Sequence, residues 1–170
     1  RFASAIPRFC PFFSSLLEAD LVLTSAAGER RVEAHDFFVA DMTTCIEPGE
    51  IVSAVAFERQ DPSERSALLE VSNGGSVFPV GGVALRWASA GGTCTLARIA
   101  AFGVGSVAQR LVDAEDALVG TDLGPTAIAA AVAAARNAVN PTGDMHADAD
   151  YRRHLVGVLI ERGLLEGEGP

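Results

Sequence analysis

The stretches FPVGGVALRWAS (residues 78–89) and TCTLARIAAFGV (residues 93–104) decide the fold of this chain. Both contain many residues that favour strands, and Gly91 and Gly92 lie between them. Two strand-like stretches separated by a glycine-containing turn indicate an antiparallel pair. The sequence therefore predicts an antiparallel sheet near the middle of the chain.

Helical patterns follow this pair of strands. Residues 108–118 carry apolar side chains at helical spacing and are followed by Gly120. Pro125 opens a second, Ala-rich helix over residues 126–139, which packs either inside its own domain or against a partner. A third helix is expected over residues 147–165. Strands followed by helices favour an α+β fold over a doubly wound parallel sheet.

The residues before this region predict a smaller β unit. Residues 21–25 and 30–34 form a predicted hairpin around a glycine turn, and residues 51–57 form the next strand after the Pro48-Gly49 turn. The run ERQDPSER (residues 58–65) is the most polar stretch of the first half. We interpret it as a boundary or an exposed connection.

Composition excludes several functional classes. The chain has 170 residues, 49% of them hydrophobic, and a net charge of -9. The acidic balance disfavours binding to nucleic acid or to an anionic membrane. All 13 cationic residues are Arg, which excludes Schiff-base lysine chemistry and the lysine of a phosphate-binding P-loop. Since no uninterrupted apolar stretch of about 18 residues occurs, no membrane span is expected.

The cysteines and histidines indicate neither a disulfide framework nor a metal site. Cys10, Cys45 and Cys94 are odd in number and widely spaced, and no CxxC motif occurs. The histidines have no metal-ligand spacing. This cysteine usage is typical of the reducing cytoplasm, and an N-terminal signal peptide is not evident.

No catalytic residue can be assigned from these patterns. Two glycine-rich segments, residues 73–76 and 103–106, invite a phosphate-binding interpretation, but a turn with Ser106 as a helix N-cap is the simpler one. Glu115 and its acidic neighbours are expected on a solvated helix face. Arg152 and Arg153 are expected to pair with nearby acidic residues or with another subunit, and exposed pairs of this kind contribute little. The residues alone therefore predict an α+β domain with a partner-binding role.

Short segments along nearly the whole chain form a further pattern. They are Ala19-Asp20-Leu21-Val22-Leu23, Gly28-Glu29-Arg30, Asp36-Phe37-Phe38, Thr43-Thr44, Glu47-Pro48-Gly49-Glu50-Ile51, Gly82-Val83-Ala84, Arg98-Ile99-Ala100, Gly103-Val104-Gly105, Ala114-Glu115 and Ala149-Asp150-Tyr151-Arg152-Arg153-His154-Leu155. In residue type and in order, these segments together resemble the FAD-binding medium subunit of molybdenum hydroxylases, the xanthine dehydrogenase and carbon monoxide dehydrogenase family. The most specific segment, ADYRRHL, resembles the family's "AEYRRHL" helix.

The resemblance implies a fold and a role. Residues 1–61 correspond to the end of a FAD-binding domain, and residues 62–170 to a C-terminal domain with a three- to four-stranded antiparallel sheet covered by three helices. In this family the subunit passes electrons from iron–sulfur clusters on a small subunit, through FAD, to an acceptor. A large subunit carries the molybdenum centre. The chain is thus expected to be part of an oxidoreductase complex and not catalytic alone.

Departures from the family pattern concern FAD. The family's glycine-rich FAD loops lie upstream, so we expect this chain to be the back part of a longer subunit. Val52 corresponds to a position whose backbone contacts the flavin. Leu69 corresponds to a position at which some members have a Lys that approaches the flavin. The resemblance thus implies one wall of a FAD pocket at these two residues, and we expect the chain alone not to retain FAD. A non-redox scaffold or assembly module with the same C-terminal fold is the alternative, and an unrelated α+β binding domain is a third possibility.

Overall fold

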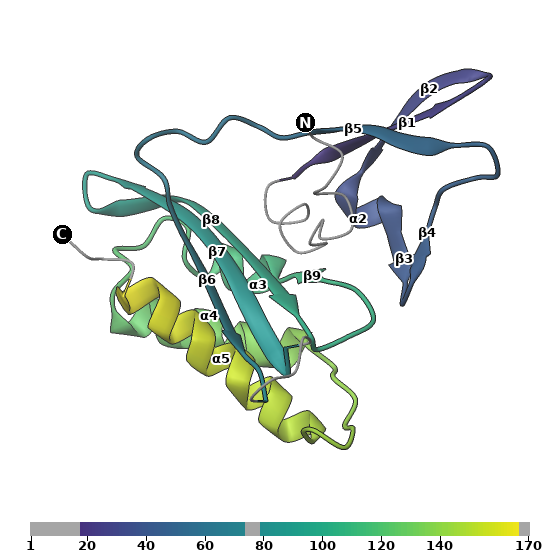
Figure 1. The fold of residues 1–170 in the computed structure, drawn as a ribbon. Helices are drawn as coiled ribbons and strands as arrows, with labels where there is room; N and C mark the ends of the chain where they lie inside the picture. Colours follow the sequence, from purple (N-terminus) through teal and green to yellow (C-terminus); the bar gives the residue numbers. More distant parts are fainter. Residues whose placement is uncertain (1–17, 74–78, 167–170) are drawn as a thin grey trace.

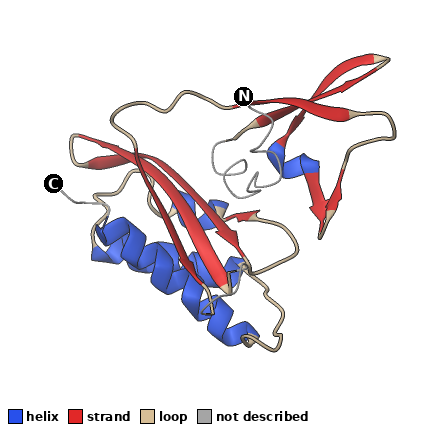
Figure 2. Ribbon diagram, in the orientation of Figure 1, coloured by secondary structure: helices blue, strands red, loops and turns tan. Residues whose placement is uncertain are grey.

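A computed structural model describes residues 18–73 and 79–166 of the chain. The described residues form two parts, each with its own antiparallel sheet, joined by residues 57–64 (Figure 1). Helices gather on one side of the larger sheet instead of alternating with its strands (Figure 2). The predicted α+β class is confirmed.

The amino-terminal part is built on a sheet with the order β2-β1-β5. β1 (Asp20–Ser25) and β2 (Gly28–Glu33) form the predicted hairpin, and β5 (Ile51–Ala56) pairs antiparallel with the other side of β1. Period-2 alternation in β1 directs its apolar side chains to one face. The small core comprises Ala19, Leu21, Leu23, Ala34 and Phe37.

A short helix and a hairpin lie between β2 and β5. Helix α2 (Ala34–Phe37) leads into β3 (Phe38–Ala40), which pairs with β4 (Thr43–Thr44). Met42 has a positive φ of 54° in the two-residue connection of this hairpin. The sequence did not predict these elements, because none carries a periodic apolar pattern long enough to be recognised.

The carboxy-terminal part contains the predicted central sheet. Its order is β6-β7-β8-β9, with β6 (Arg65–Val71), β7 (Gly81–Ala90), β8 (Thr93–Phe102) and β9 (Gln109–Arg110) all antiparallel. Gly91 and Gly92 connect β7 to β8, and both have positive φ, which glycine adopts without a steric penalty.

Three helices cover one face of this sheet (Figure 1). Helix α5 (Ala149–Glu166) packs on β6 and β7, α3 (Val112–Asp116) packs on β8, and α4 (Pro125–Ala138) packs against α3 and α5. The Ala-rich α4 therefore lies inside its own part of the molecule, with Ile128, Val132 and two alanines buried. The second and third predicted helices are confirmed.

The prediction for residues 108–118 was partly wrong. Gln109 and Arg110 pair with β8 as the short strand β9, and the helix α3 begins only at Val112. Its N-cap is Leu111, so Ser106 does not cap a helix. The backbone N–H and C=O groups of these two residues form hydrogen bonds with β8 instead of within a helix. The apolar spacing of a segment does not show whether a neighbouring strand is available for such pairing.

No helix among the described residues is long and apolar enough to cross a bilayer.

Candidate functional site

The face of the larger sheet opposite the helices has a floor of small side chains. Gly82, Ala84 and Ala100 point to this side, and the ring of Phe102 lies across Gly82. Ala84 and Ala100 are fully buried. The floor is flanked by arginines, since Arg86 and Arg98 are directly opposite each other on β7 and β8.

Arg86 binds the segment that connects the two parts. Its guanidinium donates hydrogen bonds to both carboxylate oxygens of Glu64, at 2.6 and 3.1 Å, and only 5% of Arg86 is exposed. The arginine lowers the pKa of Glu64. This bidentate pair attaches the end of the connection to the sheet.

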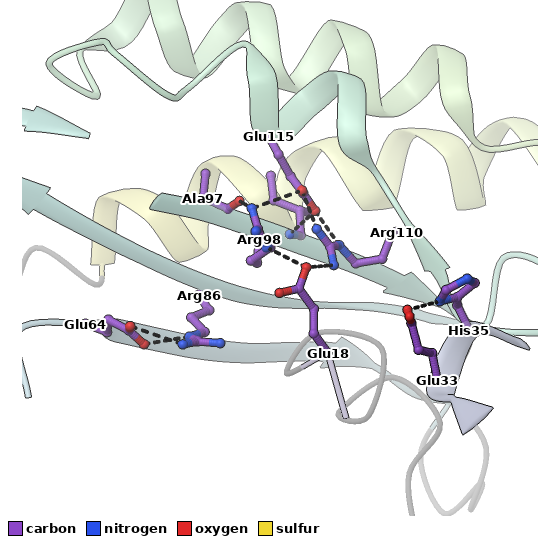
Figure 3. Close-up of polar contacts among 10 residues, drawn as sticks. Glu18, Glu33, His35, Glu64, Arg86, Ala97, Arg98, Arg110 and Glu115 are labelled. Carbon is purple, nitrogen blue, oxygen red and sulfur yellow. Dashed lines mark hydrogen bonds and ion pairs between the residues drawn. The ribbon is translucent and has the colours of Figure 1, made fainter. Parts of the chain in front are cut away.

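A second charged cluster joins the two parts at Glu18, just before β1 (Figure 3). Arg110 Nε and Nη2 each donate to the carboxylate of Glu115 at 2.6 Å, and the amide of Ile99 donates to the same group at 2.8 Å. Arg110 Nη1 and Arg98 Nε both lie 3.2 Å from Glu18 Oε1. Among the described residues, two cations and two anions therefore meet at this junction.

Glu115 is 3% exposed, so its expected position on a solvated helix face was wrong. Helix α3 packs on β8 with Ala114 and Glu115 on its buried side, and there Arg110 and the Ile99 amide compensate the buried charge. The pKa of Glu18 responds to two opposing effects. Burial raises it, but the hydrogen bond from Arg110 and the charge of Arg98 outweigh burial and lower it.

A hollow beside this cluster is lined by residues of both parts. Glu18, Glu33 and His35 line it from the amino-terminal part, and Arg110 and Val112 from the carboxy-terminal part. His35 Nδ1 lies 3.3 Å from Glu33 and is largely exposed (Figure 3). Clefts between packed units are common ligand positions, and this one presents both charge signs.

The structure does not bring Val52 and Leu69 together. Val52 lies in β5, half-buried against the small amino-terminal core. Leu69 lies in β6, half-buried against the main core, where its side chain faces Gly163 of α5. The two residues thus belong to separate hydrophobic clusters on separate sheets.

Of the two glycine-rich segments, the one at residues 103–106 lies at an end of the larger sheet, after β8. Residues 74–78 lie outside the described residues, whereas Gly103 follows β8 with a φ of 70° and lies against Gly81 and the carbonyl of Pro79. The guanidinium of Arg152 donates to the carbonyls of Val80 and Gly103 and to Asp144.

Arg152 is therefore a structural tie and not an exposed ion pair, so this prediction was wrong. It is 7% exposed, whereas Arg153 forms the expected exposed pair with Asp150. The two residues are consecutive in α5, so their side chains leave the helix about 100° apart, one towards the sheet and one towards solvent. The sequence did not reveal the role of Arg152, because the two arginines are chemically identical. They differ only in which side of α5 each one occupies.

Acidic side chains lie at the N-termini of α4 and α5, which disfavours the phosphates of a dinucleotide at these two places. A pyrophosphate needs several free backbone N–H donors, such as those at a helix N-terminus. At α4 the amide of Gly124 already donates to Asp122, and at α5 the amide of Tyr151 donates to Asp148. The segment at Gly103 precedes no helix. Among the described residues, no group of three His, Cys, Asp or Glu side chains can hold a metal ion either.

Comparison with known proteins identifies the family. Residues 70–167 match the family model described as the CO dehydrogenase flavoprotein C-terminal domain. The chain belongs to this family. It represents the C-terminal part of the FAD-binding medium subunit of molybdenum hydroxylases.

Individual relatives of this flavoprotein family agree with the match. The chain is 31% identical to the 6-hydroxypseudooxynicotine dehydrogenase complex subunit alpha of Paenarthrobacter nicotinovorans, over 87% of this chain and 50% of the relative. It is 29% identical to the carbon monoxide dehydrogenase medium chain of Afipia carboxidovorans, over 91% and 54%. The solved carbon monoxide dehydrogenase of Hydrogenophaga pseudoflava superposes with a TM-score of 0.88, at 29% identity, over 92% and 55%. The chain spans about half the length of these relatives.

Proposed function

We propose that this chain is part of an electron-transfer flavoprotein subunit of a molybdenum hydroxylase. In the assembled complex the subunit passes electrons from iron–sulfur clusters on a small subunit, through FAD, to an acceptor, and a large subunit carries the molybdenum centre. The complex is proposed to act in the cytoplasm. The observation that carries the proposal is the match over residues 70–167, supported by the TM-score of 0.88 to a carbon monoxide dehydrogenase.

Within this proposal, residues 1–61 belong to the FAD-binding domain and residues 62–170 form the C-terminal domain. Two features of the described residues support a boundary there. The two parts have separate sheets and separate hydrophobic clusters, and the exposed connection between them spans residues 57–64. Few contacts across an exposed connection are typical of a domain boundary.

We further propose that Val52 and Leu69 contribute to the FAD pocket as wall residues. Val52 is on β5, which pairs with β1 on one side only among the described strands, so its other backbone edge suits a ligand contact. Leu69 is on β6, the outer strand of the larger sheet. Its side chain faces α5, so a contact with FAD would involve its backbone.

The residues that hold the FAD phosphates are proposed to lie outside the described ones. The proposal is supported by one amide at the N-terminus of α4 and one at that of α5, which already donate to the carboxylates of Asp122 and Asp148. The same observation favours a second candidate function, a scaffold that keeps the C-terminal fold and binds the partner subunits without flavin.

One experiment separates the two functions. The purified chain is titrated with FAD while flavin fluorescence is followed, and it is then co-purified with the iron–sulfur and molybdenum subunits. We expect no stoichiometric FAD on the chain alone. Flavin in the assembled complex, reducible by substrate, supports the electron-transfer role, whereas a stable complex without flavin supports the scaffold. Stoichiometric FAD on the isolated chain would contradict our proposal for the phosphate-binding residues.

A further inference from the structure

The two parts of the molecule touch each other through few groups. Among the described residues, no helix or strand of the amino-terminal part packs extensively on an element of the carboxy-terminal part. The connection is anchored at its end by the Glu64–Arg86 pair, and residues 57–63 before it are exposed. A second attachment is needed to hold the amino-terminal sheet in one orientation, because a single anchored connection permits hinge motion.

Glu18 supplies a contact at the required place. Only the buried Ala19 separates it from β1, so its position is tied to the amino-terminal sheet. Its Oε1 lies 3.2 Å from Arg98 Nε on β8 and 3.2 Å from Arg110 Nη1 on β9. Its backbone has a positive φ of 48°, a conformation that is unfavourable for a residue with a side chain. The surrounding contacts must stabilise that conformation.

The charges on the carboxy-terminal side call for an anion. Within the described carboxy-terminal part, Arg98 and Arg110 share the buried carboxylate of Glu115. Glu115 is fully engaged with Arg110 and the amide of Ile99, and its nearest oxygen is 3.9 Å from Arg98 Nη1. Without Glu18, this 3.9 Å contact would be the one carboxylate contact left to Arg98 among the described residues, in a partly buried position where an unpaired charge is costly.

We propose that Arg98 and Arg110 form a carboxylate-binding notch on the larger sheet, and that Glu18 docks in this notch to set the orientation of the two parts. Both guanidiniums are mostly shielded from solvent, with side-chain exposures of 28% and 19%. Glu115 holds Arg110 in place before Glu18 arrives, so the notch is preorganised. This proposal concerns the polypeptide alone and does not depend on FAD.

The test uses Glu18→Ala in the 170-residue chain, which at 17.6 kDa suits solution NMR. Residual dipolar couplings of backbone amides report the orientation of each part. In the unmodified chain, couplings from both sheets should fit one alignment tensor. In Glu18→Ala, each sheet should still fit a tensor of its own, while the common fit is lost. A retained common fit overturns the proposal.

A second measurement tests the notch itself. Adding acetate to Glu18→Ala should shift the Nε resonances of Arg98 and Arg110 towards their original positions, while the same ionic strength of chloride should not. Equal shifts with both salts would show that no carboxylate-selective notch exists. Asp150→Asn, which removes an exposed carboxylate on α5, is the matched control and should preserve the common tensor. If Glu18→Ala does not fold, Arg98→Gln tests the same contact.

Discussion

Gly82 shows how a single hydrogen in place of a methyl group determines local packing. A Cβ at this position would collide with the ring of Phe102 and come within 2.9 Å of the carbonyl oxygen of Leu69. We expect Gly82→Ala to lower the free energy of unfolding by about 1–3 kcal/mol, because a well-packed site cannot accept extra volume without strain. Urea denaturation followed by the fluorescence of Trp87 measures this. Gly143→Ala, where a Cβ meets only ordinary contacts, should change stability little.

Glu50 is the residue on which the turn before β5 depends. Arg30 donates to both of its carboxylate oxygens at 2.7 and 2.8 Å, and the amide of Glu47 donates at 2.8 Å. The hydrogen bond from Arg30, followed by that from Glu47, lowers the pKa of Glu50 to about 2.

The sign of the resulting pH dependence follows from this depressed pKa. A carboxylate with a lowered pKa in the folded state contributes stability above its ordinary pKa of 4.5, and this contribution is lost as the pH falls towards about 2. We therefore expect Glu50→Gln to be less stable than the unmodified chain at neutral pH, with a difference that shrinks below pH 4.5. Thermal unfolding between neutral pH and pH 2 checks this. A constant difference over that range would contradict the assignment.

At the scale of elements, long periodic segments were predictable and short ones were not. The strands β7 and β8 and the helices α4 and α5 carry their periodicity over ten or more residues. β9, in contrast, consists of two residues whose conformation depends on the neighbouring strand. The family resemblance was visible because short motifs recur in order along the chain. The charged junction at Glu18 was not predictable, because it joins residues that are far apart in sequence and no short motif contains them both.

Arg152 ties α5 to the end of the larger sheet, and the adjacent Arg153 is a natural control. Arg152→Gln would leave the buried carbonyls of Val80 and Gly103 without their donor. We expect a loss of about 1–3 kcal/mol in unfolding free energy, the cost of such unsatisfied groups. Arg153→Gln removes only an exposed pair and should cost at most about 0.5 kcal/mol. Chemical denaturation of both variants measures the two changes in unfolding free energy. Equal changes would show that the contacts of Arg152 with the end of the sheet do not stabilise the fold more than an exposed ion pair does.

At the scale of the whole molecule, the two parts differ in how much apolar surface they bury. Among the described residues, the amino-terminal core contains five that are buried, whereas the main core of the carboxy-terminal part draws on its sheet and on helices α3, α4 and α5. Local stability follows buried apolar contact. We expect backbone amides of β1 and β5 to exchange with deuterium at least about tenfold faster than those of β7 and β8, a difference of about 1.4 kcal/mol in opening free energy. Hydrogen exchange with mass spectrometry measures this, and equal protection would indicate one cooperative unit.

By itself the sequence determined the α+β class, the central hairpin, the two long helices and the family, because each is encoded in local periodicity, turn residues or contiguous motifs. Only the tertiary structure decided that Glu115 and Arg152 are buried and that Glu18 meets Arg98 and Arg110. A charge acquires its role from the groups that surround it after folding. Those groups come from distant segments, so no local pattern along the chain specifies them.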